Sequence, residues 1–141
     1  MTDLTKVTEN SKKKVISVSS AQLVGGSTAA LRGGAYVNTT AQYDLFNIPP
    51  NCLIVDSYII AEEAGQATLT CDLGFDGGAE LINDADIDNT GVVKDAGIKI
   101  DSGTGKLVTA KFSAAPTQGR FHAVVEYIEY TRANGELTKV S

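Results

Sequence analysis

The stretch R-F-H-A-V-V-E-Y-I-E-Y-T-R, residues Arg120–Arg132, decides the fold class. β-Branched and aromatic residues dominate it, and they stand at positions of both parities, so an extended chain would be apolar on both faces along much of its length. A central strand that is covered on both sides has this pattern. The single histidine, His122, alternates with Phe121, Ala123 and Val125, which places it on the more polar face of the expected strand.

Three stretches that lie earlier in the chain also have the composition of strands. They are Tyr43–Ile48, Cys52–Glu62 and Gln66–Leu73. The first stops at Pro49-Pro50, because proline cannot donate to a strand ladder. The pair Ala64-Gly65 has the length of a hairpin turn, so the second and third stretches are predicted to pair with each other.

Further local features follow toward the C-terminus. The sequence predicts a short helical turn at Glu80–Ile87, a hairpin of Ile98–Asp101 and Lys106–Ser113 joined by Ser102–Gly105, and a last hairpin at Asn134-Gly135 leading to a strand at Glu136–Val140. No amphipathic helix of useful length is present. Short strands separated by Gly, Asn and Pro turns predict an all-β fold, a jelly-roll-like β-sandwich with an extended N-terminal arm.

The chain divides into an N-terminal arm and Gly-rich linker, 1–34, and a β-sandwich domain, 35–141. Residues 1–14 are polar and are expected to form a flexible arm. Val15–Ser19 is either a first strand or an arm that pairs with a neighbouring molecule, and Ala21–Gly34 is interpreted as loop or linker. Residues 1–10 lack the apolar run of a signal peptide, so we expect the chain to be made and folded in the cytoplasm.

Composition excludes several classes of function. The 141 residues include 12 Lys+Arg and 17 Asp+Glu, a net charge of -5, whereas a general nucleic-acid binder needs a basic footprint. The longest apolar runs are far shorter than the roughly 20 residues that cross a bilayer. One histidine and two cysteines cannot supply the four ligands of a zinc site made only of Cys and His. Cys52 and Cys71 are interpreted as buried free thiols.

One acidic segment resembles a metal-binding loop. Asp84, Asp86 and Asp88 alternate, and Asp95 stands where the last ligand of a 12-residue calcium loop would be. Asn89 replaces the glycine of such a loop, and no helices flank it. The competing interpretation is a solvated loop whose aspartates form turns and caps. The three alternating carboxylates are therefore a weak metal candidate, and a metal-dependent hydrolase built on them is the enzymatic alternative.

No credible catalytic pair emerges from the sequence. Glu62 and Glu63 are neighbours near a strand end, and Glu126 and Glu129 have opposite parity, so the carboxylates of each pair are expected to face apart. His122 would have to serve any Ser-His-Asp triad, yet a strand histidine on a polar face has the commoner explanation of surface hydrogen bonding. We therefore expect no enzyme activity and no cofactor.

The inner end of the arm is basic, in contrast to the acidic body. It carries Lys12, Lys13 and Lys14, followed by the β-prone Val15, Ile16 and Val18. A solubilising tail is one interpretation. The other is an arm that docks on an acidic surface of a neighbouring subunit, since an extended segment can add to an exposed sheet edge. These six residues are the predicted partner contacts.

The order of features from Tyr43 to Gly91 resembles a known class of protein. It runs Y-D-L-F-N-I-P-P-N, a long apolar strand, E-E-A-G, an alternating strand that ends D-L-G-F-D-G-G, and then E-L-I-N-D-A-D-I-D-N-T-G, and the chain closes on an aromatic strand at Phe121–Tyr130. This pattern, over roughly 35–131, resembles small virion structural proteins of tailed bacteriophages, in particular capsid cement or decoration proteins.

The resemblance implies a non-enzymatic role. Such proteins bind at symmetry-related positions on the outside of a shell, bridge the capsomers of the major capsid protein, and are made in the host cytoplasm. A dimer or trimer is expected, because oligomers are usually symmetric. Two alternatives stay open: a tail, neck or head-fibre component, and a carbohydrate-binding β-sandwich module. The second lacks the aromatic platforms that sugars need, since there is no Trp and aromatics are only 6%.

Overall fold

The computed structural model describes residues 16–26, 35–97 and 99–130, and every regular element in these ranges is a β-strand. The strands are β1 (Ser17–Gly25), β2 (Ala35–Val37), β3 (Tyr43–Ile48), β4 (Cys52–Glu63), β5 (Thr70–Phe75), β6 (Ile82–Asp86), β7 (Gly91–Lys94), β8 (Ile100–Asp101), β9 (Lys106–Phe112) and β10 (Arg120–Glu129). Within the described ranges no helix is long and apolar enough to cross a membrane.

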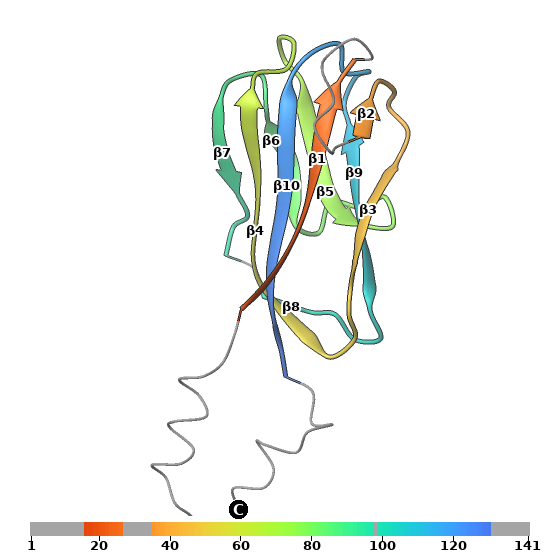
Figure 1. Ribbon diagram of the computed structural model, residues 1–141, viewed down its shortest axis with the longest axis vertical. Helices are drawn as coiled ribbons and strands as arrows, with labels where there is room; N and C mark the ends of the chain where they lie inside the picture. Colours follow the sequence, from red (N-terminus) through yellow and green to blue (C-terminus); the bar gives the residue numbers. More distant parts are fainter. Residues whose placement is uncertain (1–15, 27–34, 98, 131–141) are drawn as a thin grey trace, which may run out of the picture.

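The strands form two sheets that pack face to face (Figure 1). The larger sheet has the order β2-β1-β10-β4-β7, with the short β8 also paired to β4, and the smaller sheet has the order β3-β9-β5-β6. The chain passes repeatedly from one sheet to the other, so that β4 and β5, or β9 and β10, lie on opposite layers. This is the connectivity of a jelly roll, and the predicted fold class is confirmed.

The core lies between the two sheets and is built from the inward side chains of each strand, whose parity changes within β4 between Ile54 and Ile59, where the register with β10 shifts. Its aromatic centre is Phe112, whose ring lies 6.0 Å from that of Tyr43, edge to face, and 6.0 Å from that of Phe121. Cys52 and Cys71 are buried in this core and free, as the sequence predicts. Burial raises the pKa of the Cys71 thiol to about 12, so this group stays protonated at neutral pH.

β10 is a central strand, as its sequence predicts. It pairs antiparallel with β1 on one side and with β4 on the other. Phe121, Ala123 and Val125 point into the core, whereas His122 and Val124 lie on the outer face of the sheet. Val124 is nevertheless buried on that outer face, which accounts for the apolar residues of both parities in this strand.

Both predicted hairpins inside the described residues are wrong. β4 and β5 flank Ala64-Gly65 but belong to different sheets, and β8 pairs with β4 while β9 pairs with β3 and β5. A short connection can link two packed layers as easily as two neighbouring strands. Ser102–Gly105 remains a tight turn, since the Gly105 N–H donates to the Ser102 carbonyl at 2.8 Å.

Two local predictions also need correction. Glu80–Ile87 is not a helical turn, because Ile82–Asp86 forms the edge strand β6. Ala21–Gly34 is not entirely loop, because β1 continues to Gly25 and buries Leu23 and Val24. Glycine is required at 25, where a Cβ would collide with the backbone carbonyl of Gln118. The limit of the arm at residue 34 and the hairpin at Asn134-Gly135 lie outside the described residues, where they stay predictions.

Candidate interaction surfaces

The outer face of the larger sheet presents apolar side chains to solvent. Register places Val124 beside Tyr58, and Ile60 beside Val92, across neighbouring strands of this face. Val92 on β7 is 58% exposed, and Val18 on β1 is equally exposed at the other margin of the sheet. Apolar side chains that remain exposed on a sheet face can be covered by another protein, so this face is a candidate for such a contact.

Polar groups on the same face pair with one another. The Tyr58 hydroxyl donates to Glu126 Oε2 at 2.9 Å, and Lys94 Nζ lies 3.2 Å from Asp56 Oδ2. The hydrogen bond to Glu126, helped by burial and by the charge of that carboxylate, raises the pKa of Tyr58. These pairs fix the directions of the polar side chains, so the larger sheet presents a mixed but ordered outer surface.

His122, Glu62 and Glu63 have the positions that the sequence predicts. His122 Nε2 is 2.7 Å from Glu62 Oε1 on the outer face, and Glu63 Oε2 accepts a hydrogen bond from the buried Arg120 at 3.0 Å. Glu62 and Glu63 thus engage different partners. The single histidine has the surface hydrogen bond that its place in the strand predicts.

Only part of the predicted partner contact lies in the described residues. Ile16 is 49% exposed, and Val18 points outward from β1 at the end of the sandwich where Ser17 pairs with Tyr127 of β10. Ser17 pairs with Tyr127 and the Ser19 hydroxyl lies 3.4 Å from that of Tyr127, so Ser17–Ser19, the described end of the predicted Val15–Ser19 segment, is the start of β1. Lys12, Lys13, Lys14 and Val15 lie outside the described residues.

The outer face of the smaller sheet is polar and acidic. Its outward positions carry Asp44, Asp72, Asp84, Asp86 and Lys111. Asp72 accepts a hydrogen bond from the Asp84 N–H at 2.7 Å, which holds the irregular backbone of β6 against β5. Asp84 itself has a φ of 55°, a left-handed conformation that Asp tolerates better than most residues. This outer face is hydrophilic and favours contact with solvent.

The acidic segment does not form a calcium loop. Residues Gly91–Lys94, inside the expected 12-residue loop, are strand β7, and the Asp95 carboxylate accepts hydrogen bonds from the N–H and hydroxyl of Ser57 at 2.8 and 2.6 Å. Asp86 and Asp88 share a hydrogen bond, which raises the pKa of Asp86 and lowers that of Asp88. In the part of the chain that the structure describes, no three His, Cys, Asp or Glu side chains gather to hold a metal ion.

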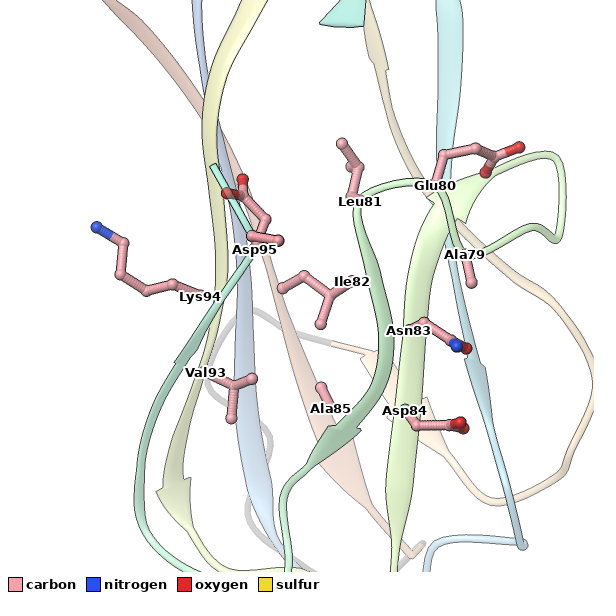
Figure 2. A pocket seen from close by; sticks show the side chains of 11 residues that line it. Ala79, Glu80, Leu81, Ile82, Asn83, Asp84, Ala85, Val93, Lys94 and Asp95 are labelled. Carbon is pink, nitrogen blue, oxygen red and sulfur yellow. The ribbon is translucent and has the colours of Figure 1, made fainter. Parts of the chain in front are cut away.

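A groove opens where the two sheets end side by side, between β6 and β7 (Figure 2). Its volume is about 340 Å³, and Ile82, Ala85 and Val93 form its apolar floor. Figure 2 shows Ile82 directed toward β7, whereas Asn83 and Asp84 are directed away from it. The groove contains no histidine, cysteine or hydroxyl side chain, and its polar lining consists of carboxylates, one amide and Lys94.

Sequence reasoning missed both the exposed valine of β7 and the groove beside it. A signal was present in Gly91-Val92-Val93-Lys94, because two adjacent valines in a strand must point to opposite faces, and one of them therefore faces away from the core. The groove left no such signal, since it arises from the relative position of two edge strands in different sheets.

Comparisons with known proteins agree on the fold. No protein-family model matches the chain, and a search of curated proteins finds no match. Among solved structures, a chain in the cyanophage Pam1 capsid asymmetric unit has a TM-score of 0.63 at 14% identity, over 82% of this chain and 86% of that chain.

Two further phage structures contain similar chains. One is the acidic stable capsid of Helicobacter pylori bacteriophage KHP30, with a TM-score of 0.61 at 15% identity over 83% of this chain and 90% of that chain. The other is the capsid of Ralstonia phage GP4, with a TM-score of 0.60 at 17% identity over 83% and 86%. These likenesses are of fold, and because both shares are high, each of these chains is close to this one in length.

Proposed function

We propose that this chain is a non-enzymatic structural protein of a phage virion, and that it acts as a cement or decoration protein on the outside of the shell. The observation that carries the proposal is the shared jelly roll: three phage capsids contain a chain of similar length that matches more than four fifths of this one. The resemblance in the order of sequence features points to the same class.

The surfaces of the molecule suit this role. Cement requires a rigid body with a broad contact face, and the larger sheet offers exposed valines at both margins with ordered polar pairs between them. We assign the partner as the major capsid protein, bound through this face. Many copies on a lattice add strength by multivalency, so no single contact has to be tight. A dimer or trimer would place such contacts around symmetry axes.

A non-enzymatic role is supported by the chemistry on the surface. The single histidine is hydrogen-bonded to Glu62 on an exposed strand face, and the groove between β6 and β7 is lined by apolar residues, carboxylates, one amide and one lysine. Neither arrangement places a serine, threonine or cysteine nucleophile beside a base.

The test is a binding experiment on shells that lack this protein. The native mass is measured by light scattering, and the protein is then co-sedimented with purified shells of its phage. Saturation at a stoichiometry set by the lattice is the expected result. A protein that leaves the shells unbound, or binds only a few copies per particle, overturns the cement role, and the second outcome favours the tail, neck or head fibre.

A further inference from the structure

The groove between β6 and β7 lies beside two strand edges that no other strand of the described residues covers. β6 is the last strand of the smaller sheet and β7 is the last of the path through the larger one. Each therefore has backbone N–H and C=O groups on one side that a further strand can pair with. The groove gives such a strand an apolar floor of Ile82, Ala85 and Val93.

The charges beside the groove favour a basic occupant. Asp84 and Asp86 are exposed on β6 on either side of the buried Ala85, while the groove's lysine, Lys94, is paired with Asp56. The described residues carry 14 Asp and Glu side chains against five Lys and Arg. Residues 1–15 have the opposite balance, with four lysines against two acids. A basic extended segment of this same chain is thus complementary to the outward face of β6 beside the groove.

We propose that Lys12–Ile16 of a second copy adds to the free edge of β6 as an extra strand. The alternation of the two segments agrees: Lys12 and Lys14 point to the face that carries Asp84 and Asp86, and Val15 points into the groove. Cross-strand pairs of opposite charge stabilise such an addition, and main-chain hydrogen bonds supply the rest. Lys13 lies at the mouth of the groove with its ammonium in water.

The segment must come from another molecule. Val15 precedes Ser17 by two residues, which span about 7 Å when extended. Ser17 is already fixed in β1, and β10 and β4 separate β1 from β7, a path of three strand spacings or about 14 Å. A chain therefore cannot place Val15 in its own groove, whereas it can place it in that of a neighbour. This self-association involves copies of this chain alone, so it stands or falls independently of shell binding.

Light scattering on the full chain tests the proposal, with concentration and salt varied. Native protein is expected to associate reversibly, and more weakly at high salt, because exposed charge pairs are screened. The groove variant Asp84→Asn with Asp86→Lys, and the arm variant Lys12→Glu with Lys14→Glu, are each expected to raise the dissociation constant roughly tenfold or more. Asp44→Lys, on the opposite edge of the smaller sheet, is the matched control and is expected to associate like native protein.

Mixing the two variants gives the decisive result. An acidic arm from one copy then meets a basic groove on the other, so the mixture is expected to associate more tightly than either variant alone. Circular dichroism and thermal melting establish that each variant is folded before it is compared. A native protein that is monomeric throughout, variants that associate like native protein, or a mixture no tighter than its components would each overturn the proposal.

Discussion

The outer faces of the two sheets share one core and one chain, yet they offer different surfaces. The larger sheet carries exposed valines at both margins, with Tyr58 and Ile60 between them, whereas the smaller sheet carries aspartates and Lys111. The inner faces of both sheets are apolar, because they pack against each other in the core. The outer faces do not pack against the other sheet, so we propose that the exposed apolar residues of the larger sheet contact a partner.

The largest expected effect separates the inner and outer sides of the larger sheet. Phe121→Ala removes a fully buried ring from the centre of the core and is expected to lower the free energy of unfolding by about 3–5 kcal/mol. Val92→Ala, on the outer side of the same sheet, is expected to change it by about 0.5 kcal/mol or less. Urea unfolding measures both values. Similar losses for the two variants would mean that the outer face contributes to folding.

The next prediction compares the two outer faces directly. Val92→Asp places a charge on the apolar face, and it is expected to weaken binding to shells roughly tenfold or more, because burying an unpaired charge in an interface is costly. Asn47→Asp adds the same charge at an exposed position of the smaller sheet and is expected to leave binding unchanged. Co-sedimentation at a series of concentrations gives both affinities. Equal losses would remove the distinction between the faces.

A third prediction concerns a place where a turn covers the outer face of the smaller sheet. Thr109 is fully buried although it faces outward, because the Gly77 N–H donates to its hydroxyl at 2.8 Å and brings the turn after β5 over the sheet. Thr109→Val keeps the shape but leaves that N–H without its acceptor, at an expected cost of about 1–2 kcal/mol. Thr109→Ser, which keeps the hydroxyl, is the control for urea unfolding. A smaller loss in the valine variant than in the serine variant would contradict this account.

The sequence predicts well which side of a strand is buried, but it predicts poorly which strands pair with each other. Strand composition in Tyr43–Ile48 and Arg120–Arg132 predicts the strands present as β3 and β10, and in β10 the alternation of His122 with Phe121, Ala123 and Val125 reports which side chains are buried. Alternation does not report which strand lies alongside. In a jelly roll consecutive strands often belong to different sheets, and for that reason both hairpins were predicted wrongly at Ala64-Gly65 and Ser102–Gly105.

The edge strand β6 was missed for a different reason. Asn83, Asp84 and Asp86 have low strand propensity, and only Ile82 and Ala85 anchor the strand to the core. Exposure on an edge makes the acidic residues acceptable, and they also discourage unwanted pairing there. The acidic segment that suggested a metal loop therefore marks an edge strand, and the groove beside it could not be foreseen from local composition.

The smallest expected effect lies within the apolar face itself, at its polar pair. The hydrogen bond to Glu126 raises the pKa of Tyr58, so the stabilisation linked to this tyrosine is fully present below its ordinary pKa and is lost as the pH rises through the raised value. Glu126→Gln is expected to bring the pKa of Tyr58 back down, as followed by the ultraviolet absorbance of tyrosinate. Tyr58→Phe identifies the signal, because it removes this component from the titration curve. An unchanged titration in Glu126→Gln would mean that the pair does not persist in solution, and that the polar groups of this face are free to reorient toward a partner.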